Sequence, residues 1–487
     1  MGAVIALLNK HDEDITKAAS TMLSALSIRK TEVYGVASPS IVRHEKSVEK
    51  LLSQNLNSSV AIGHASVKIL PQDREQPVQI GKTSLVFEGR IFDPQRLSSH
   101  RLKCALNPSE ITLEGFKRLI KQAEGDFVFV TMNSDELIAG RDVLGARPLY
   151  YGENAILAGL ASERKALWKI GIGHVKTFPP GMIAKVNRQG FKFSVIRRII
   201  NSRPRNLTMG GASEKLEQLL RKAVNDRIAG LESVAVAFSG GLDSSIIASL
   251  SQKSKVNVQL IHVSLADHSE TEHARKVADE LKLPLHSYLY SEKDVFETLP
   301  CVLDLIEEFD PVKTSIGIPF YWIAEKASQL KLKVILAGQG ADELFAGYRR
   351  YVDNYVSEGR DKVRHSLHQD VVNMYKNNLE RDFKICNFHG LELRLPFVTN
   401  KLVRFALSLP VELKLQPTDN TLRKLVLRNV GRNLGLPRSV VDRPKKAIQY
   451  ATGVSKILGR TAKREDSTVK EYLRRVYHTI FPKEDVA

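Results

Sequence analysis

The sequence predicts two domains of different fold class, joined by a short linker. Residues 1–200 contain short strand-like runs without regular alternation of strands and helices, which favours an α+β domain or a sheet-on-sheet sandwich. From residue 213 onward, strands alternate with helices, which predicts an α/β domain with an open parallel sheet and ligands at the carboxyl ends of its strands. Residues 201–212 are polar and rich in turn-forming residues, as linkers are.

The expected elements of the first domain are one helix and several short strands. Each strand run is apolar or half apolar, and turn residues separate one run from the next. The helix is expected over residues 14–27, and the strands over 3–8, 60–62, 84–87, 127–132, 137–139, 181–186 and 192–196.

The expected elements of the second domain begin with an amphipathic helix. Leucines and small apolar residues recur along one face of this helix, which starts at Glu214 and ends at Gly230. Beyond residue 350 the chain is expected to be mostly helical. Between these limits we expect strands over 234–238, 258–265, 286–290 and 333–337, with helices after residue 245, over 270–281 and through 292–331.

Composition and charge exclude several classes of protein. The chain has 487 residues, and its 43% hydrophobic and 26% charged content is ordinary for a soluble globular protein. The formal net charge of +18 raises affinity for polyanions, but no run of five or six basic residues indicates a specific nucleic-acid site. The cysteines at 104, 301 and 386 have no zinc spacing. Neither a signal peptide nor a membrane span is expected, so these features favour a cytoplasmic protein.

The segment from Val234 to Ser245 predicts a strand, a tight Ser-Gly-Gly turn and a helix N-terminus. The two glycines let the backbone approach a ligand, and the free amides of the first helical turn favour an anion. An ordinary strand-to-helix turn has the same glycines, but Asp243 distinguishes the two interpretations. A carboxylate repels the anion unless a metal lies between them, so the loop indicates a magnesium–nucleotide site. It is not a Walker A loop, because no Gly-Lys-Ser/Thr follows.

A second acidic loop follows the strand expected over 333–337. Three glycines bracket Asp342 and Glu343 there, at the same ligand-binding edge of the sheet. Considered alone, this Asp-Glu pair is equally well explained as a helix N-cap. Together with the first loop, it favours a magnesium ion shared by Asp243 and Asp342.

These segments resemble the asparagine synthetase family. Ser239–Ser245, Leu336–Tyr348, Glu392–Phe397 and Arg443–Lys446 match that family in order and at comparable spacing, and Ala139–Gly152 and Phe178–Gly181 are similar to its glutaminase domain. The resemblance covers nearly the whole chain up to residue 455. It identifies the first loop as the PP-loop of the ATP pyrophosphatases.

The resemblance also implies the fold of each domain. Residues 1–200 would form an Ntn-hydrolase-like sandwich of antiparallel sheets, the type 2 glutamine amidotransferase domain. Residues 213–487 would form an asparagine synthetase domain of the adenine nucleotide α-hydrolase-like fold, ending in a basic helical tail.

The activity implied by the resemblance is a two-step ligation. ATP and the side-chain carboxylate of aspartate give aspartyl-AMP and pyrophosphate, and ammonia then releases asparagine and AMP. ATP and Mg²⁺ are the implied cofactors, and Lys445 matches a lysine that neutralises departing pyrophosphate. Asp243 and Asp342 match the metal ligands. The implied ATP-binding residues are Ala237, Ser239, Gly240, Gly241, Asp243, Ser244, Val263, Ala337 and Gly338.

The glutaminase site departs from the family pattern at four positions. Gly2 replaces the nucleophilic cysteine that follows the initiator methionine, and Ser66 replaces an arginine. Glu88 and Arg90 replace the Asn and Glu of an Asn-Gly-Glu motif, which reverses the charges that would hold glutamine. We expect a domain that keeps its fold and has lost glutamine hydrolysis.

One departure affects the synthetase site. Gln339 stands where the family commonly has an acid proposed to assist removal of a proton from the attacking amine. An amide is no base at neutral pH, so Glu343 or water takes the proton, or the acceptor chemistry differs. Amidation by free ammonia is expected to tolerate the loss of this acid, because ammonia needs no base until after it attacks.

Three hypotheses of function follow. The leading one is an asparagine synthetase that uses aspartate and free ammonia, with or without a separate protein as ammonia source. The second is an amide- or ring-forming ligase of the same scaffold acting on another carboxylic acid. The third is an RNA-directed PP-loop protein or a non-catalytic paralogue, which the absence of paired cysteines disfavours. No membrane and no specific nucleic acid are expected as partners, and a homodimer is one alternative for the oligomeric state.

Overall fold

The computed structural model describes residues 2–92, 112–266, 270–416, 422–444 and 452–482. The chain forms two compact units. The N-terminal unit comprises residues 1–198 together with 386–390 and 476–487, and the C-terminal unit comprises 199–385 and 391–475. Two segments from late in the sequence therefore pack with the first unit. Cys301 and Cys386 are free thiols, and Cys104 lies outside the described residues.

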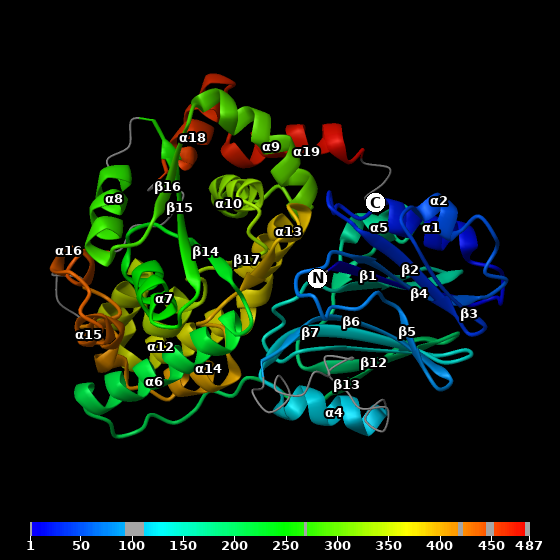
Figure 1. Cartoon of the computed structure of the whole chain (residues 1–487), viewed down its shortest axis with the longest axis horizontal. Coiled ribbons are helices and arrows are strands. Elements are labelled where there is room, and N and C mark those ends of the chain that lie inside the picture. The colour runs from blue at the N-terminus through cyan, green and yellow to red at the C-terminus, as the bar shows by residue number, and fades with distance from the viewer. Residues whose placement is uncertain (1, 93–111, 267–269, 417–421, 445–451, 483–487) are drawn as a thin grey trace. The chain divides into compact units, whose positions relative to one another are not determined.

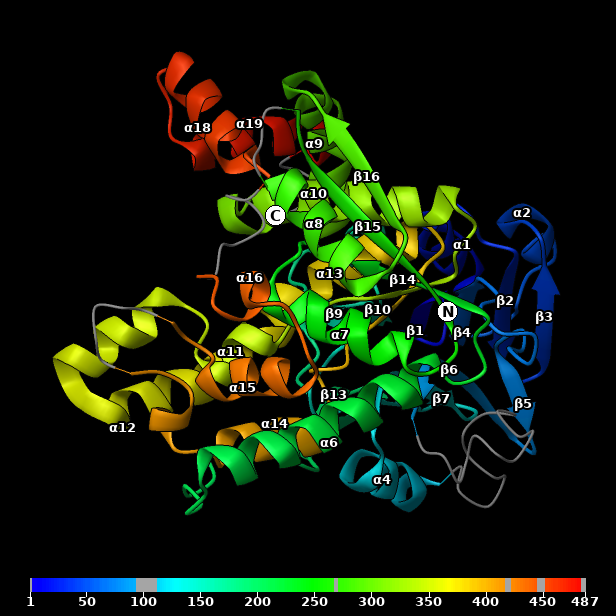
Figure 2. The same cartoon turned by 60° about the vertical axis from the view of Figure 1, so that its left-hand side comes forward.

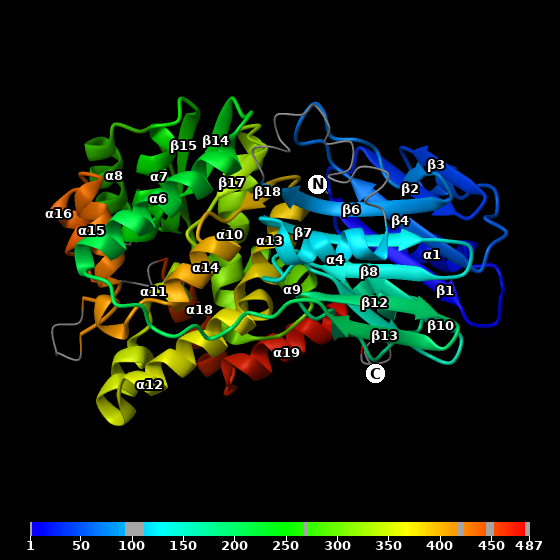
Figure 3. The same cartoon turned by 90° about the horizontal axis from the view of Figure 1, so that it is seen from below.

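The N-terminal unit has two antiparallel sheets with helices on their outer faces (Figures 1 and 3). The first sheet has the strand order β11-β9-β10-β1-β4-β2-β3, and the second has the order β13-β12-β8-β7-β6-β5. Helices α1 (Thr16–Ser24), α2 (Val48–Leu51) and α5 (Arg164–Trp168) lie over the first sheet, and α4 (Leu113–Gln122) lies over the second. The strands are β1 (Gly2–Asn9), β2 (Val33–Ser38), β3 (Ile41–Glu45), β4 (Val60–Ser66), β5 (Val78–Ile80), β6 (Thr83–Ile91), β7 (Gly125–Met132), β8 (Leu137–Arg141), β9 (Tyr150–Glu153), β10 (Leu157–Ala161), β11 (Lys176–Thr177), β12 (Met182–Asn187) and β13 (Gly190–Val195).

Strand β1 shows why this sandwich forms. Val4 and Leu8 belong to the core between the two sheets, whereas Ile5 and Leu7 belong to the core beneath α1 and α5. Because successive side chains of a strand point to opposite faces, a strand buried on both faces reads as an unbroken apolar run. On the far side, Phe116 of α4 stacks on Phe129 of β7, with ring centroids 4.1 Å apart. The predicted N-terminal sandwich of antiparallel sheets is confirmed.

The C-terminal unit contains a five-stranded parallel sheet of order β16-β15-β14-β17-β18. Figure 2 shows β14, β15 and β16 side by side, with α7, α8 and α10 around them. After β16, the chain returns to place β17 on the other side of β14, so the strand order reverses between β14 and β17. Ligands of open parallel sheets bind at this switch point. The strands are β14 (Ser233–Ala237), β15 (Asn257–Leu265), β16 (Leu285–Tyr290), β17 (Val334–Leu336) and β18 (Glu392–Arg394).

The helices that follow residue 199 agree with the expected pattern in most places. They are α6 (Met209–Ile228), α7 (Leu242–Gln252), α8 (Glu270–Leu281), α9 (Glu292–Ile306), α10 (Pro311–Gln329), α11 (Ala341–Phe345), α12 (Arg349–Met374), the π-helix η2 (Tyr375–Leu379), α13 (Glu380–Phe388), α14 (Asn400–Leu407), the 3₁₀ helix η3 (Val411–Leu413), α15 (Leu425–Asn433), α16 (Arg438–Val441), α18 (Val454–Arg464) and α19 (Val469–Ile480).

Two local expectations require correction. Helix α6 begins at Met209, because the Thr208 hydroxyl accepts a hydrogen bond from the Gly211 amide and caps the helix. Four residues assigned to the linker are therefore helical. In the region expected to be mostly helical, Glu392–Arg394 forms the edge strand β18, where the two charged side chains are buried as an ion pair.

Candidate functional site

A cavity of about 610 Å³ opens at the switch point of the parallel sheet. The residues that follow β14 and β17 line it, together with Val263 of β15. The sequence-predicted residues brought together there are Ala237, Ser239, Gly241, Asp243, Ser244, Val263, Ala337, Gly338, Gln339, Asp342 and Glu343. Lys445 lies outside the described residues, but Pro444 before it and Thr452 after it line the same cavity.

The loop after β14 is closely packed and held by its own serines. Gly240 has φ +68°, and a Cβ atom there would lie 3.1 Å from the Ala274 Cα atom, so only glycine fits without strain. The Gly241 amide donates to the Ser239 hydroxyl at 3.2 Å, and the Ser244 hydroxyl donates to the Gly241 carbonyl at 3.2 Å. Gly241 then caps α7, an 11-residue helix whose first residues, Leu242 to Ser244, line the cavity. This arrangement suits an anionic ligand.

Lys424 joins the two acidic loops, and the sequence analysis missed it. Its ammonium lies 2.5 Å from an Asp243 oxygen and 2.7 Å from an Asp342 oxygen, and its side chain is 3% exposed. Burial alone would lower the pKa of Lys424, but the two carboxylates outweigh this effect and raise it above its ordinary value. The group is therefore a buried ammonium held between two carboxylates.

Glycines make room for this cluster. A Cβ atom on Gly347 would lie 1.8 Å from an Asp342 oxygen and 2.5 Å from the Lys424 Cε atom. A Cβ atom on Gly338 would approach the Asp243 Cβ atom to 3.0 Å. The glycines of the second loop are thus required by the approach of the carboxylates and the lysine, and not only by a turn.

Asp243 and Asp342 fit a divalent metal ion. The Asp243 Oδ1 atom is buried and has no hydrogen-bond partner among the described residues, so one oxygen of the pair has bonding capacity that these residues leave unused. Among all the residues that the structure describes, no group of three or more His, Cys, Asp or Glu side chains is placed to hold a metal ion. A site with two carboxylates is typical of Mg²⁺, which completes its shell with water and phosphate oxygens.

Gln339 contacts a second acid that the sequence analysis did not identify. Its amide donates to Asp382 at 2.8 Å, and Arg381 binds the same carboxylate through two nitrogens at 2.8 and 3.0 Å. Burial raises the pKa of Asp382, against the opposing effect of Arg381 and Gln339. The position of the family's acid is therefore coupled to a buried carboxylate, although Gln339 itself carries no charge.

Glu343 lies at the polar end of the cavity. It accepts hydrogen bonds from the Tyr348 hydroxyl at 2.5 Å and from Asn378 at 2.7 Å. Burial and the neighbouring carboxylates raise the pKa of Tyr348, so its hydroxyl stays a donor. The π-helix η2 brings Asn377 and Asn378 to the cavity wall, a common role for such helices. The guanidinium of Arg350 lies 4.3 Å from the Tyr348 ring and lines the same end.

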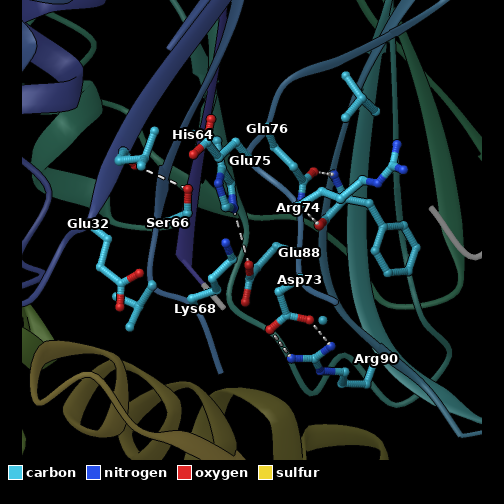
Figure 4. A pocket seen from close by; sticks show the side chains of 15 residues that line it. Glu32, His64, Ser66, Lys68, Asp73, Arg74, Glu75, Gln76, Glu88 and Arg90 are labelled. Carbon is cyan, nitrogen blue, oxygen red and sulfur yellow. Dashed lines mark hydrogen bonds and ion pairs between the residues drawn. The ribbon is translucent and has the colours of Figure 1, made fainter. Parts of the chain in front are cut away.

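The N-terminal unit has a smaller pocket of about 90 Å³, lined by Ser66, Glu88 and Arg90 (Figure 4). Gly2 pairs with Ser66 across β1 and β4. A Cβ atom on Gly2 would lie 2.0 Å from the Ala65 carbonyl oxygen and 2.6 Å from a carbon of the His64 ring. The position expected for a nucleophile therefore has no room for any side chain.

Two charged groups of this pocket, Glu88 and Arg90, are held by ion pairs. Glu88 lies 3.2 Å from His64 and 3.3 Å from Arg147, and all three side chains are buried. Burial alone would raise the pKa of Glu88, but the surrounding positive charges and the His64 hydrogen bond lower it to about 2. Arg90 makes a bidentate ion pair with Asp73 at 2.5 and 2.6 Å. Arg90 is therefore held by Asp73, and the expected effect of the Glu88 and Arg90 replacements on glutamine binding stays a prediction.

The fold and the cavity define a class: a two-unit protein whose ligand site lies between two acidic loops at the switch point of an open parallel sheet. Within that class, the chain belongs to the asparagine synthase family, whose model matches residues 215–358 and 353–484. A glutamine amidotransferase domain model matches residues 64–169.

Individual relatives agree with this assignment. A protein of Methanocaldococcus jannaschii that bears the name of a glutamine-hydrolysing asparagine synthetase 1 is 28% identical, over 95% of this chain and 96% of its own. The glutamine-hydrolysing asparagine synthetase of Asparagus officinalis is 27% identical, over 82% of this chain and 71% of its own. The Lotus japonicus enzyme named glutamine-hydrolysing asparagine synthetase 2 is 26% identical, over 81% of this chain and 70% of its own.

In the described part of this chain, none of the helices combines the length and the apolar character that a membrane span requires.

Proposed function

We propose that this protein is an ammonia-dependent asparagine synthetase. It adenylates the side-chain carboxylate of aspartate with ATP, releases pyrophosphate, and transfers ammonia to form asparagine and AMP. One observation carries the proposal: the loops after β14 and β17 bring Asp243, Asp342 and Lys424 to a single cavity, in a chain of the asparagine synthase family.

The nucleotide would lie across the switch point. Its phosphates would meet the N-terminus of α7, and its adenosine would lie against Ala237, Val263 and Gly338. Asp243 and Asp342 would hold Mg²⁺, which supplies positive charge to the phosphates. Within the chain, the buried ammonium of Lys424 and the expected position of Lys445 supply further positive charge on the pyrophosphate side.

The polar end of the cavity suits an α-amino acid. Such a substrate needs an anion for its ammonium group and a cation for its carboxylate, and it needs hydrogen bonds that fix its orientation. Glu343 offers the anion, Arg350 and Arg381 offer guanidinium groups, and Asn377 and Asn378 offer amides. Aspartate placed there would direct its second carboxylate toward the phosphates.

The nitrogen source follows from the N-terminal unit. The relatives' names describe glutamine-hydrolysing enzymes, but in this chain position 2 has no nucleophile and no space for one. The ion pairs Glu88–Arg147 and Arg90–Asp73 engage the two charged residues that replace the family's Asn and Glu. We therefore propose that nitrogen reaches the synthetase site as ammonia, either free or delivered by another protein.

One observation supports a second candidate. Gln339 replaces an acid and donates to the buried Asp382, so the proton acceptor of the amidation step differs from the family pattern. An amide- or ring-forming ligase acting on another carboxylic acid accounts for that change.

The test compares substrates with purified protein. With ATP, Mg²⁺, aspartate and ammonium chloride, we expect asparagine, AMP and pyrophosphate in equal amounts; with glutamine in place of ammonium, we expect no glutamate. Glutamate release would contradict the loss of glutaminase activity. Pyrophosphate release with other carboxylic acids but not with aspartate would favour the second candidate.

A further inference from the structure

Lys424 occupies the place that a metal ion would need. Its ammonium contacts one oxygen of Asp243 and one of Asp342, at 2.5 and 2.7 Å. These carboxylates come from different loops, and Lys424 is the group that joins them. A cation bound by both carboxylates would have to enter the same space.

The lysine is built into this position. Lys424 adopts a left-handed backbone conformation with φ +62° at the N-terminus of α15, and its side chain is almost fully buried. Beside it, Arg423 donates to the Gly347 carbonyl at 2.8 Å, and Arg428 donates to the Arg423 carbonyl at 2.6 Å. The absence of a side chain at Gly347 leaves room for the lysine arm. The contact is therefore specified by the backbone of two elements, unlike a surface ion pair.

Ammonium and metal compete for the same oxygens. While Lys424 contacts both carboxylates, a metal ion cannot bind them. The fraction of protein molecules able to bind a metal ion is therefore well below one, and the apparent metal affinity falls in proportion to that fraction. A metal that arrives with a nucleotide meets a different situation, because the phosphates offer the displaced ammonium a new anion.

We infer that Lys424 is the resident cation of the metal site: it keeps Asp243 and Asp342 together in the nucleotide-free protein, excludes a divalent cation that arrives alone, and moves to the phosphates when the cation arrives with ATP. The inference rests on the proposed function only in that the cavity binds a metal–nucleotide complex. It makes metal loading dependent on the nucleotide.

The test measures Mn²⁺ binding without nucleotide. Free Mn²⁺ is followed by electron paramagnetic resonance in titrations of the wild-type protein, Lys424→Met and Lys424→Arg. We expect weak Mn²⁺ binding by the wild type and by Lys424→Arg, which keeps the positive charge. Lys424→Met should bind Mn²⁺ more tightly than the wild type by roughly tenfold or more. The double variant Lys424→Met with Asp243→Asn should lose that gain, which would locate it at this site. Affinity for a non-hydrolysable ATP analogue with Mg²⁺ should fall in Lys424→Met.

Two results would overturn the inference: tight Mn²⁺ binding by the nucleotide-free wild type, or an unchanged affinity in a folded Lys424→Met protein. If that variant does not fold, Lys424→Gln replaces it, since its neutral amide still donates a hydrogen bond to a carboxylate. None of these readouts depends on asparagine formation. A wild-type protein that forms no asparagine would therefore contradict the proposed function. The inference about Lys424 would still be decided by the Mn²⁺ titrations.

Discussion

The two units of this chain keep their folds, but they differ in what their polar groups do. In the C-terminal cavity, one Asp243 oxygen has no partner among the described residues, and a buried lysine lies between two carboxylates. In the N-terminal pocket, Glu88 and Arg90 are engaged by Arg147 and Asp73, and the backbone of β4 fills the space beside Gly2. Groups that satisfy one another stabilise a fold, whereas groups that retain bonding capacity bind a ligand. Among the described residues, the C-terminal cavity retains such capacity at Asp243, whereas Glu88 and Arg90 of the N-terminal pocket are engaged by ion pairs.

Removing one carboxylate from the cavity should have the largest effect. In Asp243→Asn or Asp342→Asn, we expect aspartate-dependent pyrophosphate release to fall on the order of 10²- to 10³-fold, because Mg²⁺ loses one of the two carboxylates proposed to hold it beside the phosphates. Asp442→Asn is the matched control, since Asp442 pairs with Arg432 at the surface. Equal activity of the control and the two variants would contradict the account. Circular dichroism checks that the variants fold.

Adding a methyl group between the two loops should be nearly as damaging. In Gly347→Ala the new carbon would overlap an Asp342 oxygen, so we expect a loss of most activity and of about 1–3 kcal/mol in the free energy of unfolding. Gly459→Ala is the control: it lies in α18 with nothing within 4 Å of a Cβ atom. That substitution should stabilise the protein by about 1 kcal/mol. Denaturant titration and pyrophosphate release measure both effects.

Restoring a cysteine should not restore glutaminase activity. In Gly2→Cys the Cβ atom would lie 2.0 Å from the Ala65 carbonyl oxygen, so we expect no glutamate from glutamine and a loss of about 1–3 kcal/mol in the free energy of unfolding. Gly210→Cys adds a thiol where nothing lies within 4 Å and should be nearly neutral. Glutamate production by Gly2→Cys would show that the pocket retains its ability to bind glutamine.

The last prediction concerns the pH dependence of stability in the N-terminal unit. The folded pKa of Glu88, about 2, lies below its ordinary value of 4.5, so ionised Glu88 stabilises the fold fully above pH 4.5. That contribution, up to about 3 kcal/mol, disappears as the pH falls toward 2.

Glu88→Gln should therefore be less stable than the wild type at pH 7, with the difference shrinking as the pH falls below 4.5. Glu136→Gln, which removes a partly exposed partner of Lys185, should cost less than about 1 kcal/mol. Urea titrations between pH 3 and pH 7 measure both. A difference for Glu88→Gln that does not change with pH would argue against a buried, ionised Glu88.

Local patterns were sufficient to predict much of the fold. The apolar run of β1 and the alternating elements after residue 213 predict their structures because burial and periodicity act over a few residues. Strand β10, Leu157–Ala161, escaped prediction because its glycine and alanines carry no strand signal. Strand β18 escaped because its two charged side chains are buried through tertiary contacts, the Glu392–Arg394 ion pair and a hydrogen bond from Arg394 to the Arg227 carbonyl.

The candidate site was predicted where a local motif marks each residue and missed where no such motif exists. Asp243 and Asp342 each lie in the first turn of the helix that follows a strand, α7 after β14 and α11 after β17, so the parallel topology brings them together. Lys424 lies 181 residues from Asp243, and no local pattern connects them. The contact of Gln339 with Asp382 and the lack of space at Gly2 likewise depend on tertiary packing and on the register of β1 with β4.

One measurement tests the comparison of the two units most directly. Pyrophosphate release is measured with ATP, Mg²⁺ and aspartate, once with ammonium and once with glutamine as the nitrogen donor. Asparagine and glutamate are quantified in both reactions. The account predicts asparagine with ammonium, and neither asparagine nor glutamate with glutamine. Asparagine and glutamate formed in equal amounts from glutamine would contradict it.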